Sequence, residues 1–433
     1  MFELSESTLA FGKIIVTFGC IMALLRKLPL WLSILAGCLV LAFLTGLPLM
    51  ELVTMPLKSA AEADFIILIL MIFCILVLSG IQAASGQGRR LVRSMERFIH
   101  WPRVRLVIFP AMLGLLPMPG GALFSCPMLD EAAHGLNLDA RRKVLINYWF
   151  RHIWEVSWPL YPGYVLTSSL LGLSLVALLQ YTFPLVIVAT AIGWFFLMRD
   201  IKPPTTEPAY SQTEIREALR SFGYESLPLL VTLIGAVIFS LLIGSLGLPI
   251  PSQAAFLASV SCGIALALHQ GRGRMEKPLA KIAFSPANFR LVLMIFSIFI
   301  FKDVINASGI VSSMGAVGDS TVLLLLVIIV LPLFCGVLTG IMVGYVGACF
   351  PIIIGIIIKS GLEAYMVPLI ILSLVAGNIG MMLSPLHVCL VVTLNYFKSA
   401  YLSIWRDLLA PLACQIGFGA AWALLLYFLG AHF

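Results

Sequence analysis

The chain carries little charge: only 11% of its 433 residues are Asp, Glu, Lys or Arg, whereas 61% are hydrophobic. A soluble domain is about a quarter charged and about half apolar. The shortage of charge therefore excludes an ordinary soluble fold. Apolar runs of about twenty residues recur, each long enough to cross a hydrocarbon core of about 30 Å. They predict an all-α polytopic membrane protein.

The sequence also lacks the motifs of several enzyme classes. It contains no GxxxxGK[ST] loop, no HExxH and no GxSxG, and none of its nine cysteines belongs to a CxxC pair. We therefore predict no ATP drive within the chain, no enzyme activity, no bound metal and no cofactor. The cysteines are interpreted as small buried side chains. The first residues, MFELSES, contain no cation, unlike a cleaved signal peptide, so we expect the first helix to be retained.

An internal repeat relates the two halves of the chain. The segment LMIFCILVLSGIQAASG begins at Leu70, and LMIFSIFIFKDVINASG begins at Leu293, with eight identical residues in seventeen. Prolines and glycines keep nearly the same spacing further on, as in Gly114 and Gly336. We predict about ten transmembrane helices in two five-helix repeats joined by a polar cytoplasmic linker with one short amphipathic helix. The bounds are 1–198, 199–226 and 227–433.

Two proline- and glycine-rich stretches interrupt the apolar sequence at equivalent places. FPAMLGLLPMPGGALFSCP covers 109–127, and its counterpart LPLFCGVLTGIMVGYVGACFP covers 331–351. Proline cannot donate a backbone hydrogen bond, and irregular backbone at membrane depth is tolerated only where protein or a wet cavity surrounds it. We therefore expect re-entrant hairpins at about 104–134 and about 321–358. Each precedes a helix that prolines should break, at 144–165 and at 367–392.

The distribution of cations predicts that the repeats are inverted. Loops rich in Lys and Arg remain in the cytoplasm. The loop before the first hairpin holds six arginines, whereas its counterpart GIVSSMGAVGDS holds no cation. Equivalent loops should therefore lie on opposite sides of the membrane. With both hairpins re-entrant, nearly all cations fall inside, and both termini are expected outside the cytoplasm. We expect a multi-pass protein of the cell inner (plasma) membrane, and no nucleic-acid partner.

The first broken helix carries a dense group of ionisable residues close to mid-bilayer. Charges at that depth are costly and usually mark function. We interpret Arg151 as an anchor for an anion, and Glu155 with His152 as the proton-coupling group. A self-contained salt bridge between Arg151 and Glu155 is the alternative. The hairpin tips and the breaks complete the expected substrate site, which comprises Pro119, Gly120, Gly121, Asn147, Arg151, Trp158, Tyr161, Thr339, Gly340, Asn378, Ser384 and His387.

The segments LPMPGGALFSCP and NYWFRHIWEVSWPLYPGYVL, placed in this architecture, resemble the ion transporter superfamily. Its members include divalent-anion/sodium symporters and citrate- and arsenite-type carriers, and the two segments look most like a subfamily of uncharacterised membrane proteins within it. The resemblance implies a homodimer whose hairpins and broken helices move as an elevator. Sodium-coupled members carry Ser-Asn-Thr motifs at the hairpin tips, whereas only Thr339 offers such a hydroxyl here. This departure favours the proton as coupling ion, with sodium as the alternative.

Together these features predict a secondary active transporter. Its substrate is expected to be a small, carboxylate-like organic anion, moved with protons by elevator-type alternating access. Two alternatives remain open from the sequence: a cation/proton antiporter, which would also need a carboxylate at the membrane midplane, and a lipid-phosphate flippase, in which Arg151 would hold a phosphate.

Overall fold

The structure, a computed structural model, describes residues 6–25, 27–99, 101–116, 121–201, 211–246, 252–310 and 320–430. None of these residues forms a strand. Nine helices in these ranges are long and apolar enough to cross a membrane, and further apolar helices are shorter. The prediction of an all-α polytopic membrane protein is confirmed.

Six helices form a connected layer in which helices of the two halves of the chain pack against each other. They are α1 (Glu6–Leu25), α2 (Leu30–Thr45), α4 (Ala63–Ala84), α11 (Gln212–Ser245), α12 (Ser252–Gln270) and α14 (Pro286–Ala307). α4 of the first half packs against α12 of the second, and α14 of the second half packs against α2 of the first. The repeated segments end alike, because Gly86 after α4 and Gly309 after α14 both have positive φ, 69° and 61°. Short helices α3 (Leu49–Ala61), α5 (Gln87–Met95) and α13 (Leu279–Ala283) accompany this layer.

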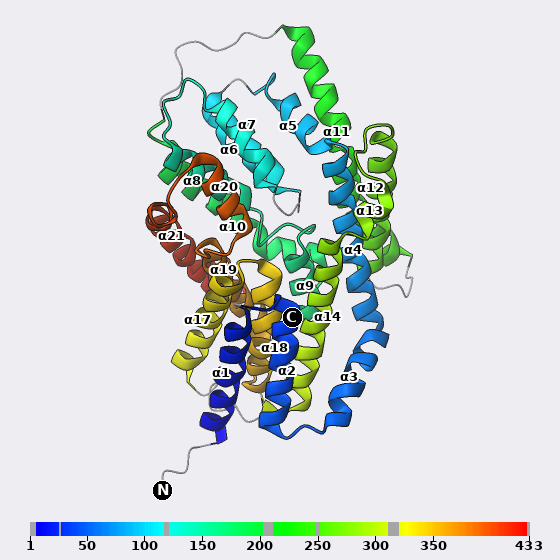
Figure 1. Ribbon diagram of the computed structural model, residues 1–433, viewed down its shortest axis with the longest axis vertical. Helices are drawn as coiled ribbons and strands as arrows, with labels where there is room; N and C mark the ends of the chain where they lie inside the picture. The colour runs from blue at the N-terminus through cyan, green and yellow to red at the C-terminus, as the bar shows by residue number, and fades with distance from the viewer. Residues whose placement is uncertain are drawn as a thin grey trace.

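A helical hairpin followed by a two-part helix occurs in each half. The first set is α6 (Pro102–Gly114), α7 (Ala122–Ala132), α8 (Ala140–His152) and α9 (Pro162–Leu171). The second is α17 (Thr321–Thr339), α18 (Met342–Lys359), α19 (Met366–Met382) and α20 (Val388–Phe397). In Figure 1 the pair α6 and α7 lies toward one end of the long axis, and α17 and α18 lie toward the other. The remaining elements are α10 (Leu175–Gly193), the π-helical turn η1 (Trp194–Met198), the 3-10 turn η2 (Glu363–Tyr365) and α21 (Tyr401–Phe428).

The two sets are joined crosswise. α18 packs against α9, and α7 packs against α20, so one arm of each hairpin contacts the broken helix of the other half. The hairpins differ in length: α6 and α7 have 13 and 11 residues, whereas α17 and α18 have 19 and 18. At about 1.5 Å per residue, neither arm of the first hairpin reaches across a core of about 30 Å. The first hairpin therefore fits a re-entrant position by length, whereas both arms of the second, α17 and α18, are among the nine described helices that are long and apolar enough to span.

Equivalent glycines allow each hairpin to cross its broken helix closely. A Cβ on Gly114 would overlap the carbonyl oxygen of Arg151 in α8, and a Cβ on Gly336 would overlap the carbonyl oxygen of Gly377 in α19. Because the obstructing atoms are backbone, no side-chain rotation relieves the overlap. The spacing of these glycines in the sequence thus corresponds to a packing contact that occurs twice.

The expected linker is shorter than predicted. Residues 212–226 belong to α11, which continues without interruption into an apolar span. The Ser211 hydroxyl accepts a hydrogen bond from the Glu214 amide, and the Glu214 carboxylate accepts one from the Ser211 amide. This reciprocal capping box starts the helix. The short amphipathic helix predicted inside the linker is therefore the first part of a 34-residue helix.

Candidate functional site

Both broken helices are interrupted at the predicted prolines. Residues 153–161 separate α8 from α9 around Pro159, and residues 383–387 separate α19 from α20 around Pro385. A helix end leaves carbonyls without partners, and the end of α19 receives one from the other half, because the Tyr148 hydroxyl donates to the Met382 carbonyl at 3.0 Å. The end of α19 therefore contacts the first broken helix directly.

Side chains from each break hold the end of the neighbouring hairpin arm. At the end of α6, Trp158 Nε1 donates to the Leu115 carbonyl at 2.8 Å, and the Tyr161 hydroxyl donates to the Gly114 carbonyl at 2.6 Å. At the end of α17, the Ser384 hydroxyl donates to the Val337 carbonyl at 2.6 Å. Carbonyls that would be unpaired at the ends of α6 and α17 thus accept hydrogen bonds from side chains of the breaks, and these bonds also hold each break against its hairpin.

A cavity of about 240 Å³ opens where the two breaks meet the second hairpin. Its lining includes backbone of the hairpin turn at Gly340 and Ile341. The polar groups that line it come from both halves of the chain: Arg151, His152, Glu155, Tyr161, His387 and Cys389. The structure therefore brings together six residues predicted for the site (Arg151, His152, Glu155, Tyr161, Gly340 and His387), which span nearly 240 positions of sequence.

Arg151 is buried beside this cavity and is not fully paired. Its side chain is only 3% exposed, and its Nη1 atom has no hydrogen-bond partner in the described part of the chain. A Cβ on Gly121 would overlap the guanidinium, so the first hairpin approaches it closely. Among the described residues no ion pair links Arg151 to Glu155, which is also buried. A self-contained salt bridge is therefore not what neutralises this guanidinium in the described conformation.

Two histidines form the centre of the cluster. His152 Nε2 lies 2.9 Å from His387 Nε2, and the ring centroids are 4.7 Å apart. His152 Nδ1 lies 2.6 Å from the Tyr148 carbonyl oxygen, and His387 Nδ1 lies 2.7 Å from the Gly340 carbonyl oxygen. His387 thereby links the turn of the second hairpin to the first broken helix.

The other described residues predicted for the site do not line the cavity. Asn147 donates to Thr393 at 3.2 Å, and its Oδ1 has no partner among the described residues; the same holds for Asn378 Oδ1. Thr339 donates to the Cys335 carbonyl of its own helix at 2.8 Å. Trp158 and Ser384 hold hairpin ends, as described above. Pro119 and Gly120 lie outside the described residues.

Sequence analysis missed Cys389, which lines the cavity and completes the cluster of His152 and His387. The sequence predicts a small buried side chain for every cysteine, whereas Cys389 is only half-buried and Cys262 and Cys414 are exposed. The available signal was its position two residues after His387, directly beyond the break at Pro385.

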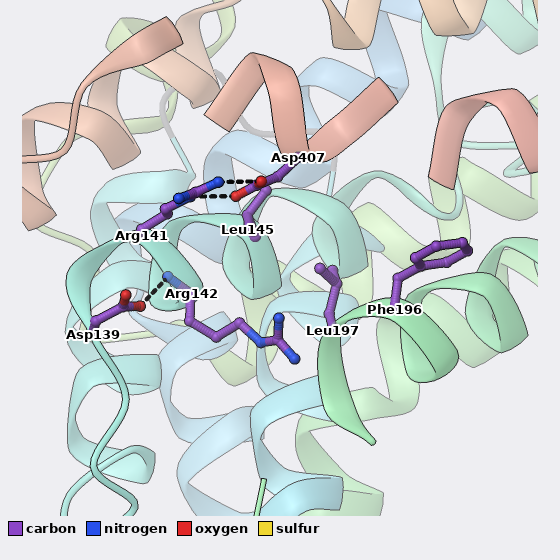
Figure 2. A pocket seen from close by; sticks show the side chains of 7 residues that line it. All are labelled: Asp139, Arg141, Arg142, Leu145, Phe196, Leu197 and Asp407. Atoms are coloured by element: carbon purple, nitrogen blue, oxygen red, sulfur yellow. Dashed lines mark hydrogen bonds and ion pairs between the residues drawn. The ribbon is translucent and has the colours of Figure 1, made fainter. Parts of the chain in front are cut away.

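A second hollow, of about 360 Å³, lies at the start of α8 and is drawn in Figure 2. In it the Arg141 guanidinium pairs with both carboxylate oxygens of Asp407 in α21, and Asp139 caps α8 by accepting from the Arg142 amide at 2.7 Å. The contact connects α8 to α21 near the surface, because 48% of the Arg141 side chain is exposed.

The Arg141–Asp407 pair is expected to stabilise the fold only slightly, because water screens an exposed ion pair. A double-mutant cycle with Arg141→Gln and Asp407→Asn should give a coupling energy of about 0.2–1 kcal/mol. Thermal unfolding of the four purified proteins measures it. A coupling energy several times larger would show that α8 and α21 depend on this pair.

The fold and the cluster define a class: an all-α multi-pass membrane protein in which two hairpins and two broken helices border a largely apolar cavity that also has buried ionisable side chains in its lining. A search of curated proteins finds no match. Residues 6–426 match the family described as "Protein of unknown function (DUF401)", and the chain belongs to that family.

Proposed function

We propose that the protein is a secondary active transporter of a small organic anion. The observation that supports this most is Arg151: a guanidinium that is 3% exposed, lines the cavity, and keeps Nη1 without a partner among the described residues. A buried cation without a partner is costly. A carboxylate in the cavity would satisfy it, and a guanidinium is suited to bind a carboxylate through two hydrogen bonds.

The proposed movement is of the elevator type. Because α7 packs on α20 and α18 packs on α9, the hairpins and broken helices can move as one unit. This unit would slide along α4 and α14, which contact α9 and α18 respectively. The substrate would stay bound beside Arg151 while the unit carries it from one side of the membrane to the other.

Transport by the purified protein in liposomes tests the proposal. We expect uptake of at least one radiolabelled carboxylate from a panel, above that of protein-free liposomes. Uptake that rises with an imposed pH gradient would assign the proton as coupling ion, whereas dependence on a sodium gradient would assign sodium. Dequenching of an internal pH dye on adding sodium or potassium, with no organic solute and no carboxylate uptake, would replace the proposal with cation/proton antiport.

A further inference from the structure

Three metal-ligating side chains converge at the cavity. The ring nitrogens of His152 and His387 and the Sγ atom of Cys389 all lie within 4.8 Å of one another. His152 ends α8, whereas His387 and Cys389 lie at the start of α20, so the cluster exists only because the two breaks meet. Both histidines are buried, with 5% and 6% of their surface exposed.

The contacts of the two rings determine where their protons lie. Each Nδ1 faces a backbone carbonyl oxygen, of Tyr148 for His152 and of Gly340 for His387. A carbonyl oxygen can only accept, so each Nδ1 carries the proton, and in a neutral imidazole the other nitrogen then presents a lone pair. The two Nε2 lone pairs face each other across 2.9 Å. Two neutral rings would repel in this arrangement, so a cation must lie between or beside them.

That cation is either a proton shared by the two rings or a metal ion, and the surroundings favour the metal. A metal-bound histidine usually donates its other ring N–H to a carbonyl or carboxylate, and both rings do so here. A shared proton needs no third donor, yet the Cys389 sulfur is present. As a thiolate it would also offset the charge of the ion, together with Glu155 in the same cavity.

The spacing of the two nitrogens fits a tetrahedral ion after a small adjustment, and the Cys389 sulfur, which lies within 4.8 Å of both, must come to about 3.6 Å from each. Zn–N bonds are about 2.0–2.1 Å, so two nitrogens on one tetrahedral zinc lie roughly 3.4 Å apart. The observed separation of 2.9 Å requires the rings to part by only about half an ångström.

We propose that His152, His387 and Cys389 bind a divalent transition-metal ion of the zinc type, with the fourth coordination position open to the cavity. This revises the sequence-based expectation of no metal. Two imidazoles and a thiolate form a ligand set that suits zinc or cobalt and does not suit magnesium or calcium, which prefer oxygen ligands. The inference does not depend on the proposed transport function, since binding of the ion can be measured without a substrate.

Cobalt(II) titration of the full-length protein tests the site. The protein is purified in detergent with a phosphine reductant, stripped of metal with a chelator, and titrated with CoCl₂ at neutral pH. We expect a single ion per chain, the intense visible bands of tetrahedral cobalt, and a sulfur-to-cobalt charge-transfer band in the near ultraviolet. Added zinc chloride should displace the cobalt and abolish both features.

Two variants and a control locate the site. Cys389→Ser should remove the charge-transfer band, and His387→Gln should weaken cobalt binding by more than the 10–100-fold typical of losing an outer-shell partner. Cys414→Ser, which removes an exposed cysteine on α21, should leave the spectrum unchanged. If wild-type protein shows no tetrahedral cobalt bands, or if the bands survive both Cys389→Ser and His387→Gln, the proposal is wrong and the rings share a proton. The wild-type measurement decides this even if a variant does not fold.

Discussion

Replacing Arg151 by glutamine is expected to abolish high-affinity binding of the anionic substrate while the protein still folds. Removing one partner of a buried, hydrogen-bonded charge pair costs about 2–5 kcal/mol, which corresponds to a roughly 30-fold to several-thousand-fold higher dissociation constant. Folding should tolerate the change, because the guanidinium is already under-partnered in the described part of the chain. The proposal under test is that an anion supplies the missing partner.

Ligand-induced thermal stabilisation measures this effect. A carboxylate at a hundred times its dissociation constant should stabilise wild-type protein by about 2.7 kcal/mol. If Arg151→Gln weakens binding a hundredfold, the same concentration stabilises the variant by only about 0.4 kcal/mol. Arg151→Lys keeps the charge but not the planar fork, and should lie between the two.

Arg142→Gln is the matched control. Arg142 lies on the same helix and lines the hollow of Figure 2. Its guanidinium is 3.8 Å from the Asp200 carboxylate, and it does not line the cavity beside Arg151. Its variant should be stabilised by the carboxylate as wild type is. If Arg151→Gln is also stabilised to the wild-type extent, Arg151 does not bind the anion, and the transporter proposal loses its main support.

Much of the fold could be read from the sequence because membrane spans and their interruptions leave local signals. Apolar length indicates the spans, and Pro159 and Pro385 indicate where helices must break, because each removes a backbone donor whatever surrounds it. The repeat added a second signal, since the same interruption at the same spacing indicates a shared architecture. The end of the linker was predicted less well, although Ser211 and Glu214 have the spacing of a capping box, which marks the start of α11.

The site could be predicted only in part because its geometry is tertiary. Arg151, His152 and Glu155 stand out locally, since charged residues in an apolar helix are rare. The contact of His152 with His387 joins residues 235 positions apart. The spacing of residues along the sequence does not predict which residues of one break face the other break. Cys389 gave only a weak local signal, its position just beyond the break at Pro385, because a cysteine in an apolar helix is ordinary. Its meaning depends on the two rings beside it.

Gly114→Ala and Gly336→Ala are each expected to destabilise the protein by about 1–3 kcal/mol or more, the range of overpacking in a core. In each variant the new methyl group overlaps backbone of the facing helix, at Arg151 or at Gly377. The hairpin arm must therefore move away from the broken helix. Thermal or denaturant-induced unfolding of the purified proteins measures the loss.

Gly417→Ala is the control, because a Cβ on this residue of α21 meets nothing within 4 Å. Replacing a glycine inside a helix by alanine should there be neutral or stabilising by about 0.5–1 kcal/mol. Equal stability of all three variants would show that the close crossings are not required. The expected contrast would show instead that the same close packing is required in both halves. Each hairpin lies close enough to its broken helix for side chains at the break to reach the hairpin's terminal carbonyls, and the cavity between the breaks depends on that closeness.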